Sequence, residues 1–193
     1  MTTSASRTWL VSLEEAKTHL RIGHTEDDAY ITRLTKAAQL VCEKLTGMVL
    51  TPCDFIMQCD EWSQTKEIPE ISIIKTISYI KYMDASSPSV QQTWSASNYE
   101  LINYSQRSRI SLVDGSSYPT LRSGPGSIEM KFSAKPSWSA NTLTALSEVA
   151  FQAVLITIAD MYENRQSVIV GRIASSIPKT AQYLLDTLKI QTL

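Results

Sequence analysis

The stretch of sequence that decides the fold is LTALSEVAFQAVLITIADMYENR, residues Leu143–Arg165. Apolar residues fall on nearly every side of a helix built from it: Leu143, Leu146, Val149, Ala150, Ala153, Val154, Ile156, Ile158 and Met161. Because a surface helix keeps one polar face, this pattern predicts a core helix surrounded by protein. The length also suits a membrane span, but Glu148, Gln152 and Asp160 argue against that alternative.

Polar residues mark both ends of this core helix. Asn141 or Thr142 can cap its start, and the letters YENR end it. Asn tolerates a left-handed C-terminal turn, and a cation there faces the negative end of the helix dipole. We predict that Tyr162, Asn164 and Arg165 are structural, with Tyr162 and Arg165 packing the helix end against the first two helices of the chain.

Two helices are predicted ahead of the core helix. Ser12 and Glu15 have the spacing of a capping box and open a short helix that Gly23 ends. A second helix starts at the acidic run Glu26-Asp27-Asp28, which we interpret as capping rather than as metal ligation, and stops at Gly47. Its inward residues recur at spacings of three and four: Ile31, Leu34, Ala38, Val41 and Leu45.

A β-prone region separates these helices from the core helix. It contains five candidate strands: Thr51–Cys59, Ile71–Met83, Trp94–Asn103, Arg109–Val113 and Ser127–Phe132. The last strand alternates, with Ile128, Met130 and Phe132 on one side. We therefore predict an α+β fold in which a helical core (two N-terminal and two C-terminal helices) carries an inserted small antiparallel β-sheet. Residues 1–193 are expected to form a single domain, built as a helical part, 1–50 plus 138–193, and a β insertion, 51–137.

Bulk composition excludes several classes of function. Eighteen basic and nineteen acidic residues give a net charge of −1, whereas nucleic-acid-binding proteins usually carry a clustered basic excess. Met1–Thr8 has one arginine and no apolar run, so we expect no signal peptide and a soluble product made in the cytoplasm. Buried reduced thiols are the expected state of Cys42, Cys53 and Cys59, with a Cys53–Cys59 bridge as the alternative.

No residue pattern predicts an enzyme, and we expect no catalytic, metal or cofactor site. His19 and His24 have no cysteine at zinc-ligand spacing. The sequence has no G-x-S-x-G motif and no phosphate-binding glycine loop. The S-x-x-K matches at Ser78 and Ser176 lack the accompanying motifs of that enzyme class. The four tryptophans could anchor interfaces, or they could pack in the core and over sheet edges.

The order of several short motifs resembles the head–tail connector (adaptor) proteins of tailed phages. The motifs are LEEAKTHLR at Leu13–Arg21, Glu26-Asp27-Asp28, Ala37-Ala38, Leu45-Thr46-Gly47, Ile77–Asp84, Asn98–Leu101, Tyr118-Pro119, Met161–Arg165, Ile177-Pro178 and Leu184-Leu185. They extend over nearly the whole chain. The chain departs from the family pattern at Lys135, where a glycine is common, and in its closing residues 189–193.

The resemblance implies a structural virion protein at the neck, assembled in the host cytoplasm. Such adaptors form a ring, expected to be a dodecamer, beneath the portal protein and join it to the stopper or tail-completion protein. DNA passes through the lumen without specific binding, and no membrane is involved. The alternatives are a stopper or tail-completion protein, or a small cytosolic enzyme or binding module.

The last predicted helix, Ser176 to about Ile190, is the candidate portal contact. Its apolar stripe comprises Ile177, Ala181, Leu184, Leu185 and Leu188. Anchors at such spacings suit a helix that docks in a groove, and the resemblance implies that adaptors reach the portal through a C-terminal segment. The alternative is that the stripe packs on the protein's own helices.

Overall fold

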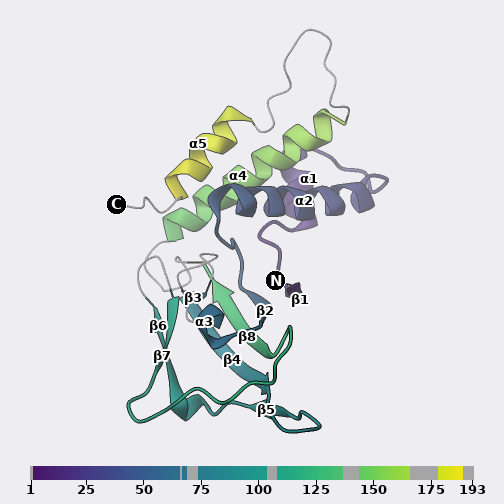
Figure 1. Ribbon diagram of the computed structural model, residues 1–193. Coiled ribbons are helices and arrows are strands. Elements are labelled where there is room, and N and C mark those ends of the chain that lie inside the picture. The colour runs from purple at the N-terminus through teal and green to yellow at the C-terminus, as the bar shows by residue number, and fades with distance from the viewer. Residues whose placement is uncertain are drawn as a thin grey trace. The chain divides into compact units, whose positions relative to one another are not determined.

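Figure 1 presents a computed structural model of the chain, which describes residues 2–65, 67–68, 74–103, 108–136, 144–165 and 178–188. The chain divides into two compact units. The sheet unit consists of Met1–Thr8 and Pro52–Ser137, and the helical unit of Trp9–Thr51 and Trp138–Leu193. Helices and antiparallel sheets together make the α+β fold that the sequence predicts.

The helical unit contains the four predicted helices, α1 (Leu13–Leu20), α2 (Asp28–Thr46), α4 (Thr144–Glu163) and α5 (Lys179–Leu188). The predicted core helix is α4, and Figure 1 shows α2 and α5 running alongside it. Its buried residues are Ala150, Ala153, Val154, Leu155, Thr157 and Ile158. The predicted cap at Asn141 or Thr142 lies outside the described residues.

Hydrogen bonds at the helix ends follow the predictions in two places and differ in one. The capping box is present, because Glu15 Oε2 accepts from the Ser12 backbone N–H at 2.8 Å and Ser12 Oγ accepts from the Glu15 N–H. Gly47 ends α2 in the left-handed conformation, as predicted, with φ 70°. Gly23 is not the stop of α1: Arg21 takes the left-handed position, with φ 56°. Backbone N–H groups of Arg21 and its successor bond the last α1 carbonyls, which offsets the cost of a side chain at positive φ.

The sheet unit holds two antiparallel sheets. The larger has the strand order β1-β2-β8-β4-β5 and the smaller β3-β7-β6. The strands are β1 (Thr2–Arg7), β2 (Cys53–Cys59), β3 (Glu67–Ile68), β4 (Ile74–Met83), β5 (Gln91–Thr93), β6 (Tyr99–Asn103), β7 (Ser108–Leu112) and β8 (Ile128–Lys135). A short helix, α3 (Trp62–Thr65), follows β2.

The short strands β3 and β5 lie outside the five predicted strands, and two further features of the sheets also differ from the prediction. Strand β1 pairs with β2, so residues 1–8 belong to the sheet and not to the helical part of the chain. Its sequence, TTSASR, has no apolar alternation to reveal a strand. The predicted strand Trp94–Asn103 is interrupted, because Ser95 caps a single 3₁₀ turn (Ala96–Asn98) ahead of β6. The predicted single sheet is therefore two.

Strand β8 is the centre of the larger sheet, with β2 on one side and β4 on the other. The predicted alternation is confirmed, since Ile128, Met130 and Phe132 are fully buried. The phenyl rings of Phe55 and Phe132 stack across β2 and β8 at 5.5 Å. Cys53 and Cys59 lie at opposite ends of β2, and Cys42, Cys53 and Cys59 are all buried as thiols, which agrees with reduced cysteines and not with a Cys53–Cys59 bridge.

No helix in the described ranges combines the length and apolarity that a bilayer crossing needs.

That the two units fold together as a single domain stays a prediction. It can be tested with one cavity-forming substitution in each unit. Ile158→Ala in α4 and Met130→Ala in β8 each remove a fully buried side chain and should each cost about 2–5 kcal/mol of unfolding free energy. If the units fold as one domain, both variants lower the midpoint of a single thermal transition. The exposed Gln152→Ala is the control, with an expected change within about 0.5 kcal/mol. Two transitions, each moved by one variant only, would contradict the prediction.

Candidate functional site

The end of α4 is tied to the start of α2 by Asp27. The Tyr162 hydroxyl donates to Asp27 Oδ2 at 2.5 Å, and Arg165 Nη2 lies 3.5 Å from the same oxygen. The Arg165 guanidinium also covers the rings of Tyr30 and Tyr162, at 4.8 and 5.0 Å from their centroids. Asn164 turns back to its own helix and donates to Asp160 Oδ1 at 2.9 Å. The sequence-predicted pair, Tyr162 and Arg165, therefore meets at one carboxylate, and Asn164 does not join it.

Hydrogen bonding and charge change the acidity of this cluster. The Tyr162 hydrogen bond lowers the pKa of Asp27 below its ordinary value, and the charges of Arg165 and His24 act in the same direction. The same hydrogen bond raises the pKa of Tyr162, because a phenol that donates to a carboxylate resists losing its proton. Asp27 precedes α2 without capping it through its side chain, so its role is to bind α4 rather than to satisfy the helix start.

The last acidic residue of the predicted capping run, Asp28, is also engaged with another helix. Its Oδ1 pairs with Lys17 Nζ at 2.6 Å, which joins α1 to α2. Glu26 is held locally by His24 at 3.0 Å. Within the described part of the chain, no group of three or more side chains is arranged to hold a metal ion.

The structure places most of the predicted portal-binding stripe inside the helical unit. Ala181, Leu185 and Leu188 are buried in the core that α4 organises, and Leu184 packs partly against it. Ile177 lies outside the described residues. The opposite face of α5 carries Tyr183, whose side chain is 72% exposed. Portal binding by the stripe itself stays a prediction, and it would require α5 to leave α4.

An aromatic cluster and a groove in the sheet unit were not predicted. Trp62 contacts three other rings, those of Tyr82, Trp94 and Tyr118, with centroids 4.8–5.9 Å away. Trp94 is buried and Trp62 half-buried, so these two tryptophans pack mainly with each other and their neighbours. The rings come from four separate segments, and nothing in the local sequence pattern joins them.

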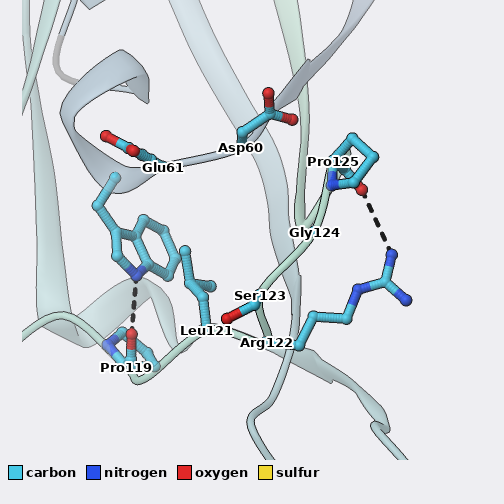
Figure 2. A pocket seen from close by; sticks show the side chains of 9 residues that line it. Asp60, Glu61, Pro119, Leu121, Arg122, Ser123, Gly124 and Pro125 are labelled. Carbon is cyan, nitrogen blue, oxygen red and sulfur yellow. Dashed lines mark hydrogen bonds between the residues drawn. The ribbon is translucent and has the colours of Figure 1, made fainter.

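The groove beside this cluster is shaped by backbone hydrogen bonds. Figure 2 shows its lining, with the Trp62 indole donating to the Pro119 carbonyl at 2.8 Å and Arg122 Nη2 donating to the Pro125 carbonyl at 3.3 Å. Asp60 Oδ1 accepts from the Gly126 N–H at 2.6 Å. The groove has a volume of about 620 Å³. Asp60 and Arg122 are thus engaged with the backbone of the groove, and Glu61 accepts from the Ser63 hydroxyl at 3.1 Å, so these charged groups shape the loop.

Asp84 organises the loop between β4 and β5. Its carboxylate accepts from the Ser86 hydroxyl, from the Val90 N–H at 2.9 Å and from Gln92 Nε2 at 3.2 Å. These bonds, led by the one from Ser86, lower the pKa of Asp84 to about 2. The residue ends the strand segment Ile77–Asp84 that carries part of the family resemblance.

A model of the phage gp6-like head–tail connector proteins matches residues 10–109, more than half of the sequence. The chain therefore belongs to the phage gp6-like head–tail connector family, and its role is that of a structural connector. Comparison with curated protein sequences finds no match.

Three solved structures are similar in fold. Two are chains from the neck of an empty gene transfer agent (GTA) particle computed with C6 symmetry and from the virion of a native GTA particle, each with a TM-score of 0.71. The third is from the neck of a native GTA particle computed with C12 symmetry, with a TM-score of 0.69. Each is 23% identical, and each comparison covers 100% of this chain and 98% of the other. At this identity the likeness concerns the fold.

The pH dependence of stability should reveal the bond between Tyr162 and Asp27. A carboxyl with a lowered folded-state pKa stabilises the protein above its ordinary pKa, 3.8 for Asp27, and loses that contribution as the pH falls through the lowered value. Tyr162→Phe should therefore be less stable than the parent chain near neutral pH, and the gap should narrow as the pH falls below 3.8. Urea unfolding across pH measures it, with the exposed Tyr183→Phe as the matched control.

If the difference in stability between Tyr162→Phe and the parent chain does not change with pH, the hydrogen bond to Asp27 does not contribute to stability. If Tyr162→Phe instead keeps the parent stability but particles fail to assemble, Tyr162 belongs to an interface.

The Asp84 loop gives a second measurable titration. In NMR the Asp84 carboxyl should titrate near pH 2, and Ser86→Ala should raise that pKa because it removes the largest of the stabilising hydrogen bonds. Ser97→Ala is the control: Ser97 is exposed, as Ser86 is, and its substitution should leave the Asp84 titration unchanged. A normal Asp84 pKa in the parent chain would contradict the hydrogen-bonded loop.

Proposed function

We propose that the chain forms a homo-oligomeric ring in the neck of a virion or virion-like particle, where it joins the portal protein to the stopper or tail-completion protein. The observation that carries this is the connector family match over residues 10–109, together with the fold shared with chains of particle necks computed with C6 and C12 symmetry. A ring with cyclic symmetry repeats one heterologous interface between neighbouring subunits. Twelve subunits are the expected number.

The ring surrounds a channel through which DNA passes without specific binding. A net charge of −1 suits such a conduit, because a strongly basic protein would hold DNA through its phosphates. The protein acts by position and shape, without a catalytic step or a cofactor. It assembles in the host cytoplasm and remains in the neck of the mature particle.

Electron cryomicroscopy of particles tests this function directly. Particles made with the chain carrying a small fused tag should show a closed ring with added density at the neck, and particles lacking the chain should lose that ring and fail to join heads to tails. Density for the tag at the tail tip or inside the head would overturn the proposal. A ring below the portal-proximal layer, with no portal contact, would favour the stopper or tail-completion alternative.

The outer face of α5 is the portal-binding surface that fits this structure. The inner stripe is engaged in the core, whereas Tyr183 is exposed in the middle of the helix. Tyrosine is enriched in protein interfaces because it combines a large apolar ring with a polar tip. We expect Tyr183 to be its anchor.

Two α5 variants separate the outer face from the core. Tyr183→Ala should leave the stability within about 0.5 kcal/mol of the parent chain but weaken the capture of the chain by purified portal rings. Leu185→Ala, which opens a cavity at a fully buried site, should cost about 2–5 kcal/mol of stability. Unchanged portal capture by Tyr183→Ala would exclude the outer face of α5.

A further inference from the structure

The outer face of α2 is basic along its length. Arg33, Lys36, Leu40 and Lys44 recur at spacings of three and four, all are exposed, and they lie opposite the buried residues Ile31, Ala38 and Cys42. From Arg33 to Lys44 the face extends about 16 Å along the helix axis. In the described part of the chain, none of the three cations has a carboxylate partner. We call these four residues the basic face.

An apolar side chain stands in the middle of the basic face. Leu40 is 46% exposed, between Lys36 one turn before it and Lys44 one turn after it. Beside it, Lys36 Nζ lies 5.7 Å from the ring centroid of Trp9. DNA phosphates would use the cations alone, whereas an exposed leucine ringed by cations suits a protein surface with an apolar recess and an acidic rim.

The same helical unit carries a recess of that kind. A groove of about 500 Å³ lies between α1 and α4, with Phe151 and Leu155 contributed by α4. Glu14, Glu15, Thr18 and His19 line it from α1. Glu148 shares the α4 face of Phe151 and Leu155, three and seven residues before them, and is exposed. We call this the acidic groove, defined by Glu14, Glu148, Phe151 and Leu155.

The carboxylates of Glu14 and Glu148 in the acidic groove are available to a partner, whereas that of the neighbouring Glu15 is not. Glu15 is occupied by the capping box with Ser12, which also lowers its pKa. Among the described residues, neither Glu14 nor Glu148 has a basic partner. The helical unit thus presents cations around an apolar side chain on one helix, and carboxylates beside an apolar recess between two others.

We infer that the basic face of α2 docks into the acidic groove of a second copy of this chain, and that this contact is the repeated interface of the ring. The inference rests on the proposed ring function and names the interface. Leu40 of one copy enters the recess at Phe151 and Leu155 of the next, while Lys36 and Lys44 face Glu14 and Glu148. Two different surfaces of one unit meet, as a head-to-tail ring requires. Opposite charges around the apolar contact also fix its register.

A charge exchange tests the interface in particles made with the full-length chain. One variant, Lys36→Glu with Lys44→Glu, makes the basic face acidic. A second variant, Glu14→Lys with Glu148→Lys, makes the acidic groove basic and leaves the capping residue Glu15 intact. Each variant alone places like charges against each other, and we expect about a tenfold or greater loss of neck rings, because like-charge contacts cost several kcal/mol.

Recombining the changes should restore the ring. A chain with all four substitutions again pairs opposite charges, and so does a mixture of the two variants if they alternate around an even-numbered ring. The matched controls carry equal charge changes elsewhere on the surface: Lys135→Glu with Arg109→Glu, and Glu100→Lys with Glu163→Lys. The controls should form rings, and melting temperatures close to that of the parent chain verify that every variant is folded.

The outcomes separate this interface from the proposed function. If the parent chain forms no neck ring, the proposed function fails. If the parent forms the ring and each single-surface variant does too, only the interface is wrong. If the lysine variant forms normal rings but packaged DNA leaks or is ejected at an altered rate, the basic face contacts DNA and the inference is overturned. Loss in both variants without recovery in the four-substitution chain also overturns it.

Discussion

Burial of most of α4, which leaves the side at Glu148 and Gln152 exposed, is the constraint on which the helical unit depends. Ala150, Ala153 and Ile158 are fully buried, and a helix of this kind requires cover from several partners at once. The buried hydroxyl of Thr157 is satisfied within the helix, since Thr157 Oγ1 donates to the Ala153 carbonyl at 2.8 Å. Helices α1, α2 and α5 each supply part of the cover. Removing any one of them would expose apolar surface that no other described element replaces.

Because α2 and α5 must cover α4, their side chains serve two purposes, one on the inner face and one on the outer face. The inner faces of α2 and α5 are committed to α4, so a partner protein meets only what those helices present outward. On α2 that is a row of cations around Leu40, and on α5 it is a polar face with Tyr183 at its centre. The fold and the proposed contacts thereby use opposite faces of the same helices, separated by helical periodicity.

The helices could be predicted from the sequence because their signals are local. Apolar spacing located α2, α4 and α5, and the capping box at Ser12 located the start of α1. Strand β1 could not be predicted from the sequence, because its polar residues show no strand pattern. Its pairing partner, β2, lies about fifty residues later in the chain. The same holds for the aromatic cluster at Trp62, whose rings converge only through tertiary packing.

The candidate surfaces divide in the same way. The sequence identifies Tyr162 and Arg165 at the end of α4, but it predicts a helix cap at Asp27, the residue that both of them contact. The stripe on α5 was correctly located as apolar, yet periodicity cannot say whether an apolar face covers its own core or a partner. That choice depends on how much of α4 the other helices leave uncovered, which is a property of the assembled core.

The place of β8 in its sheet has a consequence for how the chain is made. Strands β2 and β4 never pair with each other, because β8 lies between them and bonds both. A ribosome releases β8 last of the three, so the two earlier strands wait with their facing edges open until residues 128–135 emerge. Closing this sheet joins segments far apart in sequence, which makes it a slow step of folding. During synthesis the unpaired edges of β2 and β4 are the part of the nascent chain most exposed to wrong pairing with other chains.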